Sequence, residues 1–175
     1  LDHRNIIKHV ETIENISFLY IITELVRDGD LFDYVLRKQF LEGNQLFFDY
    51  PLTSSPEIEA QTVMKQLFEC LSYLYDAGVI HRDLKPENIL IVLDPTTQRI
   101  KEIKLIDFGF AKFVTEEHKL FEACGTPNYA GKPYFLSLYQ SEINTDMYPS
   151  SGGFDWEGYD QRADMWSAGI IMYFL

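Results

Sequence analysis

The sequence predicts an α+β fold, in which short antiparallel strands accompany longer helices. Two pairs of short apolar runs joined by turn residues, at residues 6–25 and 89–106, are typical of β-hairpins. Between the two pairs, apolar residues recur every three or four positions from Val63 to Leu74, a spacing that places them on one face of a helix. The chain has 175 residues, of which 46% are hydrophobic, so it is long enough for one domain with a buried core.

The first hairpin is expected at residues 6–13 and 17–25, with Glu14 and Asn15 between its strands. The apolar residues of both strands indicate an ordinary buried hairpin. His9 is accordingly expected to be a core histidine whose hydrogen bonds are satisfied.

Two helices are expected after this hairpin. The first occupies residues 31–38, and Asp30 suits its N-cap. The second begins after Ser55, an N-capping residue followed by a proline at the first helical position, and ends at Gly78. Its apolar stripe consists of Val63, Met64, Leu67, Leu71 and Leu74. This helix is expected to give the residues that follow it a rigid support.

The second hairpin is expected at residues 89–93 and 100–106, with turn residues at 94–97. The longest apolar run, residues 168–175, has the pattern of a helix but is far too short to span a membrane. The sequence also has no N-terminal signal pattern, so no membrane partner is expected.

The charge of the chain is acidic, with 15 Lys and Arg against 27 Asp and Glu and a net charge of -12. This balance argues against a general nucleic-acid footprint and is compatible with basic partners. A soluble acidic surface explains the same charge without any partner. The two cysteines, Cys70 and Cys124, have neither a disulfide nor a metal-binding spacing, which indicates a reducing compartment. The expected location is therefore the cytoplasm, with the nucleus also compatible.

The chemistry is concentrated between residues 80 and 111. Two carboxylates, Asp83 and Asp107, occur there with Lys85 and Asn88, between short apolar runs. Phosphoryl transfer from ATP needs a cation with hard oxygen ligands, a positive charge on the moving phosphate, and a group that orients the acceptor hydroxyl. Asp107 and Asn88 suit Mg²⁺, Lys85 suits the phosphate, and Asp83 suits the hydroxyl.

In these motifs the chain resembles the eukaryotic protein kinases. His81-Arg82-Asp83-Leu84-Lys85-Pro86-Glu87-Asn88 matches the catalytic loop of that family at every position, and Asp107-Phe108-Gly109 matches its metal-binding triplet. The resemblance implies ATP and Mg²⁺ as cofactors and a protein or peptide as substrate. The lysine at position 85 indicates serine or threonine acceptors, because tyrosine kinases have an arginine in this loop.

The resemblance implies part of a protein-kinase-like fold. Residues 1–25 correspond to the last two strands of the small lobe and the start of the hinge, and residues 26–175 to most of the helical large lobe. Relatives are shorter in two places, so insertions are expected near residues 41–55 and 131–157. The glycine-rich loop and strand lysine of the family do not occur in this sequence, so this stretch alone is expected to have little activity.

The resemblance also implies a nucleotide site. Glu24 and Val26 correspond to the hinge that pairs with adenine, and Leu90 to the residue below the adenine ring. Asp30 corresponds to an acid that contacts the ribose or a substrate arginine, while helix capping explains it equally well. Glu87 corresponds to an acid that receives a substrate arginine, with ion pairing inside the lobe as the alternative. The implied cofactor-binding residues are Glu24, Val26, Asp30, Lys85, Glu87, Asn88, Leu90 and Asp107.

Residues 110–126 match an activation segment, the loop whose ordering controls a kinase. Glu122 stands where many relatives have a phosphorylated threonine, and its carboxylate is expected to pair with Arg82 and partly replace a phosphate. A solvated loop glutamate is the alternative. The resemblance further implies that Thr126 bridges Asp83 and Lys85.

The resemblance implies two more contacts. His81 and Phe108 are expected to stack and so to join the two catalytic motifs. Asp164 corresponds to a buried acid that accepts hydrogen bonds from the backbone of the catalytic loop.

One family motif is missing. After Tyr129 the family continues with Ala-Pro-Glu, and the glutamate anchors the end of the activation segment, but this chain has neither that alanine nor that glutamate. Two functions are therefore weighed: a serine/threonine kinase, and a non-catalytic kinase-like regulatory or binding module, either a pseudokinase or an aberrantly spliced product.

The residues of the motifs are most like those of the calcium/calmodulin-dependent kinase group, which implies substrates with basic residues near the site. Any regulation by calmodulin or calcium is expected outside this stretch.

Overall fold

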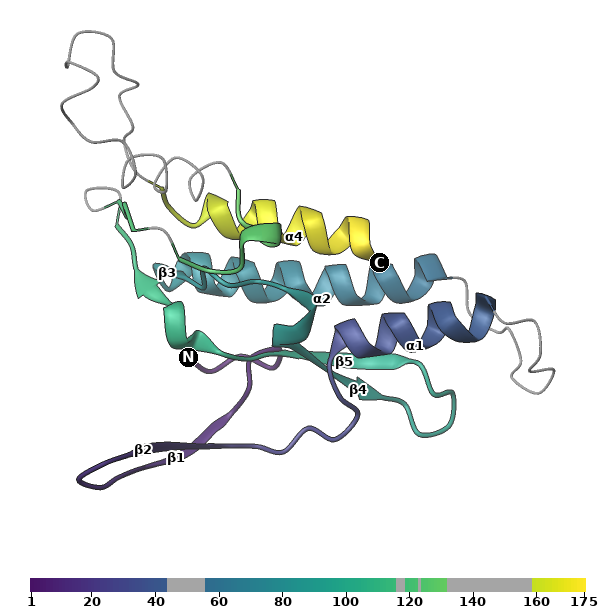
Figure 1. Cartoon of the computed structure of the whole chain (residues 1–175), viewed down its shortest axis with the longest axis horizontal. Helices are drawn as coiled ribbons and strands as arrows, with labels where there is room; N and C mark the ends of the chain where they lie inside the picture. Colours follow the sequence, from purple (N-terminus) through teal and green to yellow (C-terminus); the bar gives the residue numbers. More distant parts are fainter. Residues whose placement is uncertain (44–55, 116–118, 123, 132–158) are drawn as a thin grey trace, which may run out of the picture. The chain divides into compact units, whose positions relative to one another are not determined.

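The structure is a computed structural model of the chain, and it describes residues 1–43, 56–115, 119–122, 124–131 and 159–175. The two predicted insertions lie outside these ranges, except for residues 41–43 and Gly131. The strands are β1 (His9–Glu14), β2 (Leu19–Thr23), β3 (Val79–Ile80), β4 (Ile89–Leu93), β5 (Ile100–Leu105) and β6 (Lys112–Phe113). The helices are α1 (Leu31–Gly43), α2 (Pro56–Asp76) and α4 (Arg162–Phe174), with short 3-10 turns at η1 (Pro86–Asn88), η2 (Phe108–Phe110) and η3 (Pro127–Tyr129). These elements confirm the predicted α+β class (Figure 1).

The chain forms two compact units. Unit 1 contains Leu1–Cys70, Pro86–Ile106 and Leu175, and unit 2 contains Leu71–Lys85 and Asp107–Phe174. The division into family lobes at residue 25 is a different division, and it stays a prediction.

In unit 1, β1 and β2 form the expected antiparallel hairpin, with His9 opposite Thr23 and Glu14 opposite Leu19. The side chain of Asn15 closes the turn by accepting hydrogen bonds from the backbone of Ser17 (2.9 Å) and Phe18 (2.8 Å). Every residue of both strands is exposed, because two strands alone leave both faces of their sheet open.

The predicted burial of His9 is therefore wrong. His9 is exposed, and its ring contacts the hydroxyl of Thr12 at 2.7 Å. The apolar alternation of the strands was a correct signal for strands, but no described element covers the face on which His9 lies.

The second hairpin of unit 1, β4 and β5, is buried. Ile89 lies opposite Leu105 and Ile91 opposite Ile103, and all four side chains are fully buried. In the turn, the carboxylate of Asp94 accepts hydrogen bonds from the two following backbone groups, which agrees with the predicted turn. Helix α1 packs against η1 and β4, so this hairpin has a cover that the first hairpin lacks.

Helix α1 begins as predicted and ends later. The Oδ1 atom of Asp30 accepts a hydrogen bond from the backbone of Asp33 at 2.8 Å, so Asp30 caps this helix. The helix continues to Gly43 rather than ending at Lys38, because the residues after Lys38 include good helix formers.

Helix α2 confirms its predicted stripe, whose members Val63, Met64, Leu67, Leu71 and Leu74 are all buried. A buried polar network fixes α2 to β5: the Oε1 atom of Gln66 accepts hydrogen bonds from Asn5 Nδ2 (2.8 Å) and the backbone of Ile103 (3.1 Å). No helix in the described ranges is both long enough and apolar enough to cross a membrane.

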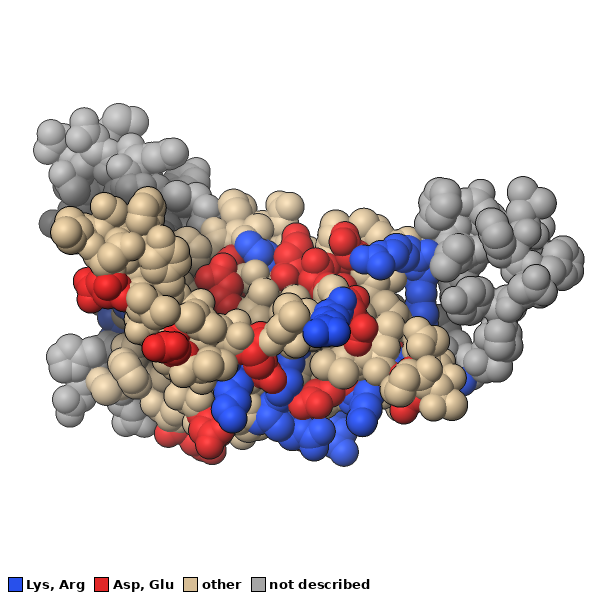
Figure 2. Space-filling model, turned by 90° about the horizontal axis from the view of Figure 1, so that it is seen from below, with Lys and Arg blue, Asp and Glu red and all other residues tan. Residues whose placement is uncertain are grey.

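The surface of unit 1 carries paired charges. The ammonium group of Lys104 lies 3.2 Å from the carboxylate of Glu24 and 3.5 Å from that of Glu102. On the face drawn in Figure 2, Lys and Arg side chains lie among Asp and Glu side chains. The net negative charge of the chain does not produce an unbroken acidic surface on that face.

Unit 2 starts at the end of α2, where Gly78 adopts a left-handed conformation (φ 66°) and ends the helix as predicted. The chain then enters β3, which pairs with β6 so that Val79 lies opposite Phe113. Ile80, Val114 and Tyr159 form a small buried cluster. This cluster holds β3 in place just before the catalytic motif.

Candidate active site

Asp83 lies at the centre of a hydrogen-bond network in unit 2. Its side chain is only 5% exposed. Its Oδ1 atom accepts hydrogen bonds from the backbone (2.8 Å) and the hydroxyl (2.7 Å) of Thr126, and its Oδ2 atom accepts one from the ammonium group of Lys85 (2.9 Å). Lys85 also donates to the Thr126 hydroxyl at 2.9 Å, so the predicted bridge by Thr126 is confirmed.

These contacts set the charge of Asp83. Burial alone would raise the pKa of this carboxyl, but the hydrogen bonds from Lys85 and Thr126 outweigh burial and hold the pKa below its ordinary value. Asp83 is therefore an ionised carboxylate at neutral pH, with both oxygen atoms in fixed directions.

The backbone on each side of Asp83 is also held. The carboxylate of Asp164, which is 3% exposed, accepts hydrogen bonds from the backbone of His81 (2.7 Å) and Arg82 (2.9 Å), as predicted. Arg82 has a left-handed backbone (φ 72°), an unfavourable conformation that such contacts maintain. Burial raises the pKa of Asp164, and the two backbone N–H groups oppose that rise.

Asp107-Phe108-Gly109, the predicted metal-binding triplet, lies against the predicted catalytic loop. The rings of His81 and Phe108 meet edge to face with their centres 4.8 Å apart, which confirms the predicted stacking. The guanidinium Nε of Arg82 donates a hydrogen bond to the carbonyl of Phe110 at 2.5 Å. The loops that carry Asp83 and Asp107 are thus joined by two contacts.

Asp107 differs from Asp83 in being exposed. Its backbone is left-handed (φ 61°), and its Oδ1 atom accepts a hydrogen bond from the backbone of Gly109 at 3.2 Å. Mg²⁺ prefers oxygen ligands and usually keeps several waters beside one or two carboxylates and the substrate phosphates. An exposed carboxylate with a fixed loop behind it fits that requirement.

Asn88, the other predicted metal ligand, lies in η1 of unit 1 with its side chain buried. Its backbone carbonyl accepts a hydrogen bond from Ile106 at 2.9 Å. That Asn88 and Asp107 share one cation stays a prediction. In the described part of the chain, no group of three or more His, Cys, Asp or Glu residues is arranged to hold a metal ion, and a site completed by phosphates needs fewer protein ligands.

The predicted nucleotide residues of unit 1 have structural contacts of their own. The backbone of Glu24 donates to the carbonyl of Lys8 at 2.9 Å, and the Glu24 carboxylate accepts from the backbone of Lys8 at 2.9 Å. This bond and the nearby Lys104 lower the pKa of Glu24 despite slight burial. Asp30 pairs with Leu90 through a β-bridge, and Val26 is half-buried. Adenine pairing by Glu24 and Val26 stays a prediction.

Glu87 in η1 is half-buried, and one of its carboxylate oxygens, Oε2, is buried with no hydrogen-bond partner among the described residues. Buried carboxylate oxygens normally have a partner. The two predicted explanations for Glu87, a substrate arginine and an ion pair inside the lobe, both stay predictions.

The activation segment reaches the catalytic loop through Glu122. Its carboxylate lies 3.5 Å from the guanidinium of Arg82 and 2.5 Å from the ammonium group of Lys112. The hydrogen bond and charge of Lys112, followed by those of Arg82, lower the pKa of Glu122. The predicted pairing with Arg82 is confirmed, while the side chain of Glu122 is also 65% exposed, so whether its carboxylate replaces a phosphate stays a prediction.

Gly125 lets this segment lie directly on the catalytic loop. Its backbone is left-handed (φ 97°), and a Cβ atom there would lie 2.2 Å from the carbonyl oxygen of Arg82. Only glycine avoids both the conformational strain and this collision. The next residue is Thr126, so the close approach of Gly125 delivers Thr126 to Asp83.

Three contributors were not predicted: Lys112, Gly125 and Tyr159. Lys112 lies in β6, near the start of the activation segment, and its role depends on the pairing of β6 with β3, which is too short to recognise from sequence. Gly125 directly precedes Thr126, and Tyr159 stands five residues before Asp164, and both Thr126 and Asp164 had predicted contacts. These neighbours were the available signal, although they assign neither Gly125 nor Tyr159 a contact.

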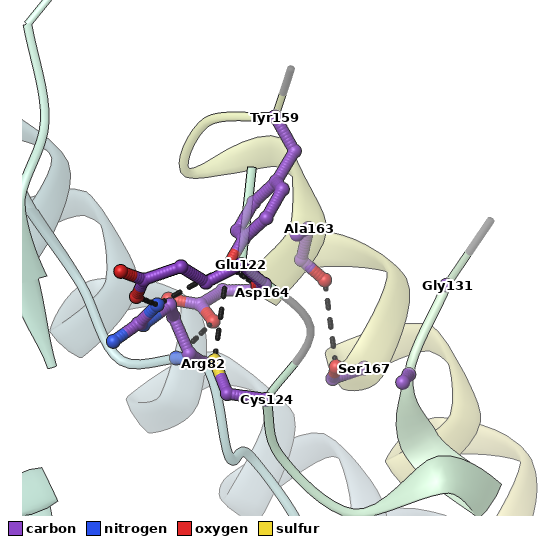
Figure 3. Close-up of a pocket in the computed structure, with 9 residues that line it drawn as sticks. Arg82, Glu122, Cys124, Gly131, Tyr159, Ala163, Asp164 and Ser167 are labelled. Atoms are coloured by element: carbon purple, nitrogen blue, oxygen red, sulfur yellow. Dashed lines mark hydrogen bonds and ion pairs between the residues drawn. The ribbon is translucent and has the colours of Figure 1, made fainter. Parts of the chain in front are cut away.

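A cavity of about 30 Å³ lies behind Arg82 in unit 2 (Figure 3). Its lining includes Arg82, Glu122, Cys124, Tyr159, Asp164 and Ser167. This volume holds a water molecule or two and is far smaller than a nucleotide needs. The cavity is therefore part of the packing between the activation segment and α4.

Comparison with known proteins identifies the family of the chain. A family model described as "Protein kinase domain" matches residues 1–175. The gamma catalytic chain of phosphorylase b kinase, liver/testis isoform, from Bos taurus is 34% identical over 173 residues, covering 99% of this chain and 34% of that protein.

Two other relatives are a probable serine/threonine-protein kinase of Dictyostelium discoideum, 35% identical over 176 residues, and calcium-dependent protein kinase 5 of Plasmodium falciparum, 35% identical over 175 residues. Each match covers 100% of this chain, with 16% and 24% of the respective relatives. The chain thus spans about a third or less of the length of these relatives. The family model matches the whole chain, and the hydrogen-bond network around Asp83 is present in the structure. The chain belongs to the protein kinase domain family.

Proposed function

We propose that this chain is the catalytic-domain part of a serine/threonine protein kinase, which transfers a phosphoryl group from ATP to a protein hydroxyl. The observation that carries the proposal is the network around Asp83, whose two oxygens are held by Lys85 and Thr126. A group that orients an acceptor hydroxyl needs this kind of fixed direction.

In this proposal Asp83 accepts the hydrogen bond, and then the proton, of the substrate hydroxyl. The lowered pKa of Asp83 keeps it ionised for this role. Lys85 lies beside it and supplies positive charge for the transferred phosphoryl group, while Thr126 fixes both side chains.

Asp107 and Asn88 would hold Mg²⁺, and the hinge residues Glu24 and Val26 would hold adenine. When bound, Mg²⁺ and ATP supply the phosphoryl group and neutralise the charge on its oxygens. The exposed carboxylate of Asp107 supports this assignment. Protein kinases in general use this pair of cofactors.

The proposed substrates have a basic residue near the acceptor serine or threonine. Glu87 is half-buried, and its carboxylate is the group that would pair with a substrate arginine. Regulation by calcium or calmodulin would act through parts of the protein beyond this chain. One relative is named a calcium-dependent protein kinase, which supports that possibility.

The proposed location is the cytoplasm, with the nucleus also compatible. Cys70 is buried and Cys124 half-buried, and the structure assigns neither of them to a disulfide. This state suits a reducing compartment.

The test is phosphoryl transfer by the full-length protein, with ATP, Mg²⁺ and a serine peptide that contains an arginine. We expect Asp83→Asn and Asp107→Asn each to lower kcat on the order of 10²- to 10⁴-fold, because one removes the base and the other a charged metal ligand. Asp76→Asn, an exposed acid at the end of α2, is the matched control and should retain the wild-type rate.

The second candidate is a non-catalytic kinase-like module, favoured by the missing Ala-Pro-Glu sequence. It predicts nucleotide binding without phosphoryl transfer, or neither. Equal rates for wild type, Asp83→Asn and Asp107→Asn would remove the kinase proposal and leave this candidate.

A further inference from the structure

Tyr159 lies directly before α4 and is fixed at both its backbone and its side chain. Its backbone N–H donates to the carbonyl of Leu120 at 2.8 Å, and its carbonyl accepts from the backbone of Leu120 at 2.9 Å. Its side chain is 8% exposed and packs with Ile80 and Val114. Tyr159 therefore ties the activation segment to the start of α4.

The hydroxyl of Tyr159 makes a second set of contacts, and Figure 3 shows the ring directed toward Glu122 and Arg82. The hydroxyl donates to the carbonyl of Glu122 at 2.7 Å and accepts from Nη1 of Arg82 at 3.2 Å. Since a phenol has one proton, the thiol of Cys124, whose Sγ lies 3.7 Å away, is then a donor to the same oxygen. One oxygen atom thus contacts the catalytic loop and two positions of the activation segment.

We infer that the Tyr159 hydroxyl is a positioning group, which holds Glu122 and Cys124 of the activation segment against Arg82 and thereby keeps Thr126 on Asp83. Its effect on catalysis rests on the proposed function. Its effect on the order of the segment does not, because the contacts exist whether or not the protein transfers phosphate.

The path from Tyr159 to Asp83 is short. Cys124 is followed by Gly125, whose close approach to Arg82 leaves no room for a side chain. Thr126 comes next and donates two hydrogen bonds to Asp83. Only Gly125 separates Cys124 from Thr126, so release of the segment at Cys124 also loosens the residue that holds Asp83.

The hydroxyl is better placed for this role than the carboxylate of Glu122. The side chain of Glu122 is 65% exposed, so solvent and salt screen its pairing with Arg82. The hydroxyl of Tyr159 is buried, and burial raises its pKa to about 12. It therefore remains a protonated donor throughout the physiological range.

The experiment compares wild type with Tyr159→Phe in the full-length protein. This change removes one oxygen and retains the ring that packs with Ile80 and Val114. The first measurement is the rate at which iodoacetamide modifies Cys124, followed by peptide mass mapping, with the fully buried Cys70 as the internal reference. We expect Cys124 to react about tenfold faster in the variant, the effect of losing a hydrogen bond to a charged group.

The second measurement is hydrogen exchange of the Thr126 amide, which donates to Asp83 in the wild type. This exchange should also become about tenfold faster in Tyr159→Phe. Tyr75→Phe is the matched control, because Tyr75 is 62% exposed on α2, and it should change neither rate.

The third measurement is the pH dependence of kcat/KM. If the hydrogen bonds from Thr126 to Asp83 weaken, the pKa of Asp83 rises. The acid limb of the profile should therefore move to higher pH in Tyr159→Phe. A purely structural role would lower activity without moving this limb. Unchanged Cys124 and Thr126 rates in Tyr159→Phe would overturn the inference. Faster rates in a protein with no phosphoryl transfer would support the inference and remove the proposed function instead.

Discussion

Asp83 and Asp107 carry the same side chain on two loops of unit 2, but their surroundings differ. Asp83 is buried and accepts hydrogen bonds from Lys85 of its own loop and from Thr126 of the distant activation segment. Asp107 is exposed, and the bond to Gly109 comes from its own loop. A base needs one fixed direction, whereas a metal ligand needs an oxygen left open for the ion. The environment of each residue, rather than its type, separates the two proposed roles.

The comparison predicts that changes around Asp83 act through its supports. The largest effect is expected for Asp164→Ala, which leaves the backbone N–H groups of His81 and Arg82 buried without their acceptor. Each such group costs about 1–3 kcal/mol, so we expect the free energy of unfolding to fall by about 3 kcal/mol or more. Urea denaturation followed by circular dichroism measures the loss.

Asp76→Ala serves as the control for this change, because Asp76 is exposed and its removal buries no orphaned group. A loss below about 1 kcal/mol for Asp164→Ala would show that the catalytic loop keeps its conformation without this support.

The next effect is expected for Thr126→Val, which preserves the shape of the side chain and removes the hydroxyl between Asp83 and Lys85. We expect kcat to fall about ten- to a hundredfold, because Asp83 loses one of the bonds that fix its direction. The pKa of Asp83 should also rise, which moves the acid limb of kcat/KM to higher pH.

Thr126→Ser retains the hydroxyl and should recover most of the lost activity. If Ser and Val at this position behaved alike, the bridge would be irrelevant to catalysis. A change in kcat with no movement of the acid limb would show that Asp83 is not the titrating base.

The pH dependence of the wild type follows from the same contrast. The pKa of Asp83 is lowered in the folded protein, so its stabilising contribution is fully present above its unfolded-state pKa of about 4 and is lost as the pH falls through the lower folded-state value. The lower limit of pH 5 lies about one pH unit above the unfolded-state pKa. We therefore expect Asp83 to cause no loss of stability between about pH 5 and 8. Unfolding midpoints measured from pH 3 to 8 in wild type and Asp83→Asn should converge only at the acid end.

The two hairpins of unit 1 show how much of the fold the sequence predicts. Both were predicted as antiparallel pairs, and both form. Their apolar residues gave the same signal for burial, yet one face of β4 and β5 is buried while β1 and β2 are exposed throughout. A periodic pattern indicates which residues need a cover, whereas burial depends on another element being in contact, which the pattern of one strand does not contain.

The candidate site was predicted best where the family motif joins distant residues. The contacts of Thr126 with Asp83, of Asp164 with Arg82, and of Glu122 with Arg82 were all predicted from matched positions, and all are present. Periodicity has no means of pairing residues so far apart. The hydroxyl of Tyr159 was missed because its acceptor is a backbone carbonyl, which no side-chain pattern marks.

The smallest effect is expected at the exposed edge of the site, for Glu122→Ala. Glu122 pairs with Lys112 and Arg82, but its side chain is largely in solvent, so at physiological salt we expect kcat/KM to fall by no more than about fivefold. Because salt screens exposed pairs, the difference from wild type should widen at low ionic strength and nearly vanish at about 1 M salt. Glu69→Ala, an exposed acid on α2, should show no such salt-dependent difference. Unchanged activity in Glu122→Ala at every salt concentration, together with a requirement for phosphorylation elsewhere in the segment, would refute the idea that this carboxylate replaces a phosphate. In that case the activity would depend on the buried Asp83 and the residues that support it, and the exposed carboxylate of Glu122 would contribute nothing.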